Sequence, residues 1–266
     1  MVERRELARG REALQRREVA PRLTVPRENR VFLSAEWRDL VMLNYEVDRG
    51  LLKDYVPAGT ALDSFEGRTF VSLVAFQFRR TRLFDLFAIP FHSDFDEVNL
   101  RFYVRPTGAN GDRRGVVFVA EIVPKWAVAK MARLAYGENY VSLPMKHRVE
   151  TNGASKTAEY EWKLKGARCR LNAHSSAAPA QAEEGSLEQF ITEHYWGYSA
   201  RRGGESLEYH VSHDPWNVWK CTDAGFEGDA SGLYGAALGK VLQRRPDSAF
   251  IADGSPVKVF TGQRIR

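Results

Sequence analysis

The chain has 266 residues, of which 44% are hydrophobic and 27% are charged. That composition is typical of a soluble globular protein and excludes a disordered or fibrous character for the whole chain. The formal net charge is +5, from 39 Lys and Arg against 34 Asp and Glu. Such an excess would suit a polyanion if it were clustered on a folded surface.

The excess charge lies at the N-terminus. Residues 1–30 hold nine Arg and five Glu, a balance of +4, whereas the other 236 residues carry 30 basic and 29 acidic groups. We therefore expect no nucleic-acid partner for the folded domain. The first segment has helix formers but few apolar residues, which predicts a basic, helical or frayed extension over 1–30 and a single domain over 31–266.

The two cysteines, Cys169 and Cys221, cannot build a disulfide framework or a CxxC metal pair, so a reducing compartment is expected. No apolar segment follows the N-terminal charges, and no window of about 18 residues is free of charge. We predict a cytoplasmic protein with no signal peptide and no membrane partner.

From Val31 onward, short apolar runs are broken by Gly, Pro and Asp, a pattern typical of many strands and few long helices. Strands are predicted over residues 40–47, 69–78, 96–105, 115–123, 140–149, 156–164 and 168–175. Helices are predicted over residues 48–55, 126–134, 186–193 and 234–243. Ser186 and Gln189 have the spacing of a capping box, which marks the start of the third helix.

The segments 70–78 and 116–123 are apolar on both alternating faces, which predicts strands covered on each side. The segment 97–104 differs because one of its faces is polar: Glu97, Asn99, Arg101 and Tyr103. That face could point to solvent, or, because its neighbours in sequence are buried on both faces, it could line an internal cavity. Inside, Glu97 and Arg101 would each need a partner or a ligand, since about 13 Å of strand separates them.

Motifs for dinucleotides, phosphate-binding loops, serine hydrolases and zinc proteases are absent from the sequence. His210 and His213 lie three residues apart in a segment predicted as a strand, where their side chains point to opposite faces. We therefore expect no metal and no cofactor.

Aromatic residues are dense in two short segments, 193–198 and 213–216. They could be ordinary core packing, or they could form a pocket wall in which His and Tyr supply hydrogen bonds. The sequence leaves both interpretations open.

Several blocks resemble the YqjF-like uncharacterised family, a domain of unknown function. They are FLSAEWRDLVMLNYEVD (32–48), YVPAGTALDSFEGRTFVSLVAFQF (55–78), FDEVNLRFYV (95–104), RGVVFVAEIVPKWAVAKMARLAYGENY (114–140), SLEQFITEHYWGY (186–198), VSHDPW (211–216) and PDSAFIADGSPVKVF (246–260). That family is similar to the acetoacetate decarboxylase superfamily. The resemblance implies an α+β fold of mainly antiparallel β, a cone-shaped barrel around a small-molecule cavity, and peripheral helices.

The resemblance also implies where a catalytic lysine would lie. Acetoacetate decarboxylases carry a Lys–Lys pair after a Tyr-Gly turn, and one lysine forms a Schiff base. Placing that turn on Tyr136-Gly137 puts the pair at Tyr140 and Val141, so Schiff-base decarboxylation is not expected. Glu97 falls where the superfamily keeps an acidic cavity residue. Three other lysines are expected to be solvated: Lys125, Lys130 and Lys146.

The leading hypothesis is a small-molecule-binding protein that lacks the Schiff-base lysine pair and performs no covalent catalysis. The alternative is an enzyme acting on a small carbonyl or carboxylate compound by acid–base chemistry through Glu97. The sequence leaves open whether the protein forms a homo-oligomer, and it assigns no catalytic residue. The candidate pocket residues are Glu97, Asn99, Arg101, Tyr140, His194, Tyr198, His213 and Trp216.

Overall fold

The computed structural model describes residues 30–265 except 86, 89–92, 109–110 and 202. Apart from Arg30, the predicted extension over residues 1–30 lies outside the described residues. Within the described ranges no helix is long and apolar enough to cross a membrane.

Fourteen of the strands described form one large sheet. They are β1 (Val31–Val47), β2 (Thr60–Leu62), β3 (Thr69–Leu83), β4 (Phe87–Ala88), β5 (Phe95–Pro106), β6 (Gly115–Val123), β7 (Tyr140–Ser142), β11 (Ala180–Gln181), β12 (Trp196–Ala200), β13 (Ser206–His213), β14 (Asn217–Lys220), β16 (Ser248–Ala252), β17 (Pro256–Phe260) and β18 (Gln263–Ile265). Four more form a second sheet: β8 (Met145–Asn152), β9 (Ser155–Leu164), β10 (Ala167–Ser175) and β15 (Asp223–Glu227).

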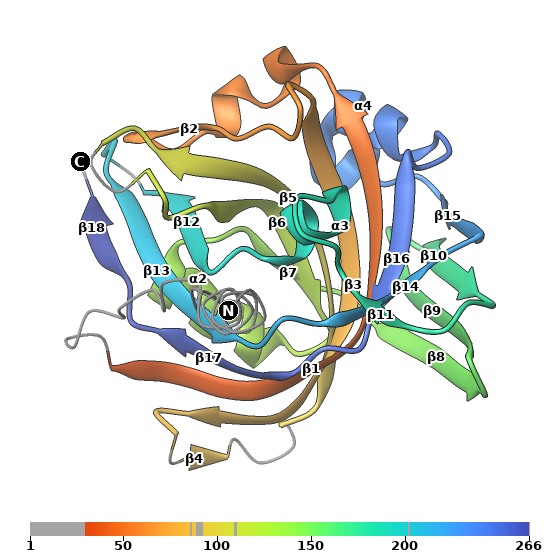
Figure 1. Ribbon diagram of the computed structural model, residues 1–266. Coiled ribbons are helices and arrows are strands. Elements are labelled where there is room, and N and C mark those ends of the chain that lie inside the picture. Colours follow the sequence, from red (N-terminus) through yellow and green to blue (C-terminus); the bar gives the residue numbers. More distant parts are fainter. Residues whose placement is uncertain (1–29, 86, 89–92, 109–110, 202, 266) are drawn as a thin grey trace, which may run out of the picture.

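Seven strands of the large sheet close a ring of pairings. They are hydrogen-bonded in the order β1, β17, β13, β12, β6, β5 and β3, and β3 in turn pairs with β1. Only the β6–β12 pair of this ring is parallel. Figure 1 shows these strands around the centre of the molecule, with the second sheet at one side. The described chain is thus mainly antiparallel β with few helices, as predicted.

Strand β1 bends near Asp39. This residue has a left-handed φ of 54°, and the register against β3 shifts between Arg38 and Val41. Two residues of β9 hold the bend from outside. Lys156 pairs with the Asp39 carboxylate at 2.6 Å, and the Tyr160 hydroxyl donates to the Asp39 carbonyl oxygen at 2.8 Å. The second sheet is therefore anchored to the point where β1 changes direction.

The buried apolar residues form two clusters on opposite faces of the large sheet. One joins β1, β3 and β5 to the second sheet and to helix α4 (Ser231–Leu242), through residues such as Leu43, Trp162 and Leu238. The other includes Leu40 and Phe76 and surrounds a pocket. Strands β3, β5 and β6 lie between the two clusters, so both of their faces are buried.

The helices that bear on the pocket are α2 (Trp126–Tyr136) and α3 (Leu187–Thr192). Helix α2 is peripheral on one side, with Lys130 exposed, but its other side supplies Val128 and Tyr136 to the pocket wall. The Ser186 side chain accepts a hydrogen bond from the Gln189 backbone N–H at 3.2 Å and so caps α3, as its spacing indicates.

Apart from shifts in their bounds, two of the predicted elements differ from the structure in kind. The strand predicted over 140–149 is split into β7 and β8, which belong to different sheets, at Leu143-Pro144. Proline lacks the backbone N–H that a continuing ladder needs. The helix predicted over 48–55 is two short 3₁₀ turns, η1 (Arg49–Leu51) and η2 (Lys53–Tyr55).

A substitution of Gly197 on β12 tests how closely this strand packs against Tyr209 of β13, a residue of the pocket wall. A Cβ at this position would overlap the ring of Tyr209 on the paired strand. We expect Gly197→Ala to destabilise the protein by about 1–3 kcal/mol, the usual cost of overpacking a dense core. The measurement is the midpoint of urea unfolding. Gly225→Ala is the matched control, because a Cβ added there would meet nothing within 4 Å; equal midpoints for the two variants would contradict this packing.

Candidate functional site

The polar face of β5 opens into the pocket. Glu97, Asn99 and Arg101 line it and are 3%, 2% and 8% exposed, while Val98 and Leu100 point into the opposite core. Of the two expectations for this face, the structure supports the internal one. The pocket volume is about 110 Å³. A cavity of about 150 Å³ holds one benzene molecule, so this pocket suits a ligand of only a few heavy atoms.

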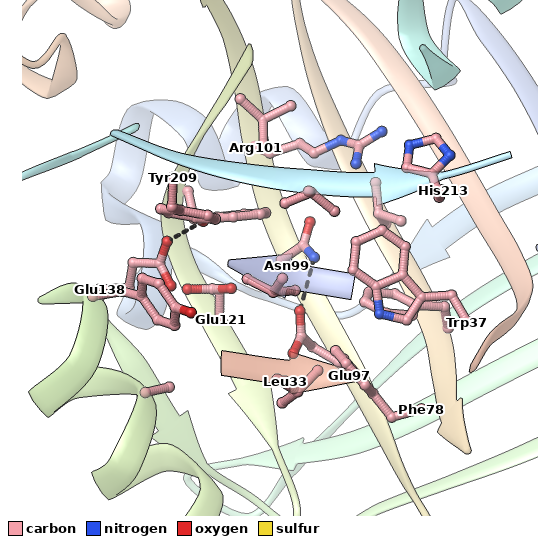
Figure 2. A pocket seen from close by; sticks show the side chains of 18 of the residues that line it. Leu33, Trp37, Phe78, Glu97, Asn99, Arg101, Glu121, Glu138, Tyr209 and His213 are labelled. Atoms are coloured by element: carbon pink, nitrogen blue, oxygen red, sulfur yellow. Dashed lines mark hydrogen bonds between the residues drawn. The ribbon is translucent and has the colours of Figure 1, made fainter. Parts of the chain in front are cut away.

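Three glutamates from different segments meet at one end of the pocket (Figure 2): Glu97, Glu121 and Glu138. Glu121 lies on β6, opposite Asn99 of β5 on one side and Tyr140 of β7 on the other. Glu138 follows Gly137, whose left-handed φ of 73° ends α2 and turns the chain. We call these three residues the carboxyl cluster.

The hydrogen bonds of the carboxyl cluster come from neutral donors. The Asn99 amide donates to Glu97 at 3.1 Å, and the Tyr140 hydroxyl donates to the second Glu97 oxygen at 3.3 Å. The Tyr209 hydroxyl donates to Glu138 at 2.5 Å. Oε2 of Glu121 has no hydrogen-bond donor. Among the described residues, no Lys, Arg or His forms an ion pair with any of the three.

Burial and mutual repulsion keep protons on the carboxyl cluster. Burial raises the pKa of Glu97 to about 8 and that of Glu138 to about 7. It raises the pKa of Glu121 well above its ordinary value, with the negative charges of Glu138 and Glu97 adding to the effect. Since a carboxyl loses its favourable hydration when buried, the neutral form is favoured. The cluster therefore carries much less than three negative charges near pH 7.

The other end of the pocket is basic. Arg101 donates to the Ile191 carbonyl oxygen at the end of α3, at 3.0 Å, and to the Met42 sulfur, at 3.8 Å, while its Nε has no partner. Both ring nitrogens of His194 are also without partners. Burial, with the nearby positive charges of Arg101 and Arg114, lowers the pKa of His194 well below its usual value, so this imidazole is neutral. His213 lies close by, and its ring stacks on Trp216 at 4.3 Å.

The structure brings together seven of the eight candidate residues predicted from the sequence. Glu97, Asn99, Arg101, Tyr140, His194, His213 and Trp216 all line the pocket. Tyr198 is not among the lining residues. It lies on β12 in the buried cluster that the large sheet shares with the second sheet, and its hydroxyl donates to the Arg113 carbonyl oxygen at 2.9 Å. Ligand contact by the other seven stays a prediction.

Sequence reasoning missed three residues: Glu121, Glu138 and Tyr209. A signal for Glu121 was present, because it is the only charged residue in a strand predicted to be covered on both faces. Glu138 and Tyr209 carry no such signal, since their proximity depends on the turn at Gly137 and on the place of β13 in the ring. In the part of the chain that the structure describes, no group of three or more His, Cys, Asp and Glu side chains is arranged to hold a metal ion.

Solved structures of known proteins define the fold class. The chain is similar to an acetoacetate decarboxylase from Legionella pneumophila subsp. pneumophila str. Philadelphia 1, with a TM-score of 0.64, 12% identity, and coverage of 92% of this chain and 93% of the other. It is also similar to the enduracididine biosynthesis enzyme MppR in its complex with pyruvate, with a TM-score of 0.61, 14% identity, and coverage of 92% and 93%. The chain thus has an acetoacetate decarboxylase-like fold.

Within that class, the sequence places the chain in one family. Residues 34–256 match DUF2071, described as an uncharacterized conserved protein, and the chain belongs to this family. It is 29% identical over 184 residues to the uncharacterized protein YqjF of Bacillus subtilis (strain 168), covering 68% of this chain and 72% of that protein. The resemblance seen in the sequence is confirmed.

The raised pKa of Glu97 predicts how stability varies with pH. Between its unfolded value of 4.5 and its folded value of about 8, the folded chain binds more protons than the unfolded chain, so stability falls as pH rises. We expect the free energy of unfolding in urea to fall less steeply between pH 6.5 and 8 in Glu97→Gln than in the wild type.

Other titrating groups do not reverse the expected difference. Glu121 and Glu138 also make stability fall as pH rises, and removing the Glu97 charge lowers the pKa of Glu121, which flattens the curve of the variant further. The histidines with lowered pKa, His194, His210 and His213, add stability only as pH rises toward 6.5. The pKa of His147 is raised by its hydrogen bond with Asp96, so its contribution to stability is lost above pH 6.5, and this loss is equal in the wild type and in Glu97→Gln. Glu150→Gln, at an exposed position, is the control and should match the wild type. Parallel curves for Glu97→Gln and the wild type would disprove the prediction.

Proposed function

We propose that the protein binds a small organic carboxylate without forming a covalent bond, in a cone-like barrel formed by the ring of strands. The unpartnered polar atoms of buried residues in the pocket carry this proposal: Arg101 Nε, Asn99 Oδ1 and both ring nitrogens of His194. A buried polar group without a partner costs about 1–3 kcal/mol. A ligand that supplies the missing partners would remove that cost.

The basic end of the pocket favours a carboxylate. Arg101 is the only Lys or Arg among the described residues that line the pocket. Its planar guanidinium matches a carboxylate, and the surrounding apolar walls strengthen the attraction by excluding water. The size of the pocket and the pyruvate complex of MppR, a protein of the same fold, support a small carboxylate as the ligand class.

The positions of the lysines support non-covalent binding. The described lining residues include no lysine, and Tyr140 stands where the resemblance places a Schiff-base position. Lys130 is exposed on α2, and Lys146 is 76% exposed and pairs with Glu161. Lys125 is partly buried just before α2 begins.

A binding experiment with Arg101→Met tests the proposal. We expect acetate, pyruvate and acetoacetate at millimolar concentration to raise the melting temperature of the wild type, because a ligand of the native state stabilises it. The variant should lose at least tenfold in affinity for these probes. Arg105→Met, at an exposed position on the same strand, is the matched control. Circular dichroism reports whether each variant is folded, and equal affinities for Arg101→Met and the wild type would refute the assignment.

A trapping experiment addresses the covalent alternative. Borohydride reduces a Schiff base to a stable adduct, so incubation with acetoacetate and borohydride followed by mass measurement detects any reactive lysine. We expect the mass to be unchanged. A trapped adduct would contradict non-covalent binding.

A second candidate function is acid–base catalysis on an enolisable carbonyl compound. It is favoured by the contact of 3.3 Å between the Tyr140 hydroxyl and Glu97, whose pKa of about 8 suits a group that exchanges a proton near neutral pH. In this reaction Glu97 would take the proton next to the carbonyl group, and a neutral hydroxyl would donate to the developing oxyanion.

Deuterium exchange separates this enzyme from a simple binding protein. In deuterated water, we expect such an enzyme to exchange the methyl protons of pyruvate, measured by proton NMR, at least tenfold faster than buffer alone. Glu97→Gln should abolish the acceleration while retaining pyruvate binding. Exchange at the buffer rate by the wild type would refute this reaction and favour the binding protein.

A further inference from the structure

The carboxyl cluster has no positively charged partner among the described residues. Glu97, Glu121 and Glu138 are 3%, 1% and 9% exposed. Their side-chain hydrogen bonds come from amide and hydroxyl groups and from the contact between Glu121 and Glu138 themselves, all of them uncharged donors. Glu121 lines the pocket, and its Oε2 is buried and has no hydrogen-bond donor. This atom is an independent sign that the group meant to face it comes from outside the chain, since buried polar atoms are rarely left unpaired.

A ligand ammonium group fits this end of the pocket. Glu97, Glu121 and Glu138 all line the pocket, so their oxygens offer acceptors to the N–H donors of an ammonium group, and a positive charge removes the repulsion that keeps them protonated. A neutral hydroxyl has a single donor and leaves that repulsion in place. A metal ion is less suitable, because the described residues include no metal-binding arrangement of His, Cys, Asp and Glu.

The two ends of the pocket belong to one row of β5. Glu97 and Arg101 are four residues apart on the same face, and Asn99 lies between them (Figure 2). A ligand held along this row meets acidic groups at one end and a guanidinium at the other. The apolar and aromatic side chains around it, such as Phe76 and Phe78, exclude water and make an uncompensated ligand charge costly.

We infer that the ligand is a small zwitterion, with an ammonium group in the carboxyl cluster and a carboxylate at Arg101. This inference rests on the proposed function, because it adds the amine to the carboxylate already assigned. The pocket volume of about 110 Å³ limits the ligand to a few heavy atoms. Because about 13 Å of strand separates Glu97 from Arg101, an amine and a carboxylate at opposite ends of a chain, as in 4-aminobutyrate, suit the two ends better than glycine does.

Binding of such a ligand has a pH signature. The ammonium group replaces protons on the carboxyl cluster, so binding near pH 7 releases protons and tightens as pH rises toward 8. The titratable groups near the cluster are Tyr136, Tyr140, Tyr209 and, from α4, Tyr234, which stay neutral in this range because burial raises their pKa. At the other end, Arg101 stays charged, and His194 and His213 stay neutral because burial lowers their pKa.

Matched pairs of probes test the inference by isothermal titration calorimetry. Glycine, β-alanine and 4-aminobutyrate are compared with acetate, propionate and butyrate at pH 6.5 and 8, in buffers with different heats of ionisation. We expect at least one amino acid to bind ten times more tightly than the carboxylate of the same length at pH 8, and to release protons on binding.

Variants of the cluster assign the effect to these residues. Glu121→Gln should reduce the preference for the amino acid at least fivefold and change the carboxylate affinity less than twofold. Glu138→Gln serves if that variant fails to fold, and Glu46→Gln, at an exposed position on β1, is the matched control. If the amino acids bind no better than the carboxylates, the inference is overturned and the proposed function stands. If no probe binds, both are overturned.

Discussion

The exclusion of water from both faces of β5 is the constraint on which the pocket depends. Its apolar face joins the core shared with the second sheet, and its polar face lies inside the ring of strands. Without bulk water, the polar side chains must find partners within the protein or on a ligand. The raised pKa of Glu97, the neutral His194 and the unfilled hydrogen-bonding groups of Arg101 all follow from this burial.

Sequence patterns predict the local part of this arrangement well. Apolar residues on both faces identify β3 and β6 as interior strands, and strict alternation separates Glu97, Asn99 and Arg101 from the apolar side of β5. The site as a whole is not predictable in this way, because it depends on distant segments meeting. Asn99, Glu121 and Tyr140 become neighbours only through the registers of β5, β6 and β7, and no periodicity within one segment contains that information.

The carboxyl cluster also shows why such a site is costly to build. Three buried glutamates without a cation make the folded state less stable as pH rises, and hydrogen bonds from tyrosines offset only part of that cost. A core of apolar side chains in the same place would be more stable. Local chemistry that lowers stability in this way is common at functional sites, where it is compensated by the packing around them.

The bend of β1 at Asp39 connects the second sheet to the strands that surround the pocket. Lys156 and Tyr160 belong to the second sheet and do not line the pocket, yet they hold the residue at which β1 turns. Because β1 pairs with β3 on one side and with β16 and β17 on the other, its direction helps set the curvature of the ring. Substitutions in the outer sheet therefore change the width of the pocket over evolutionary time while every residue that lines it stays the same.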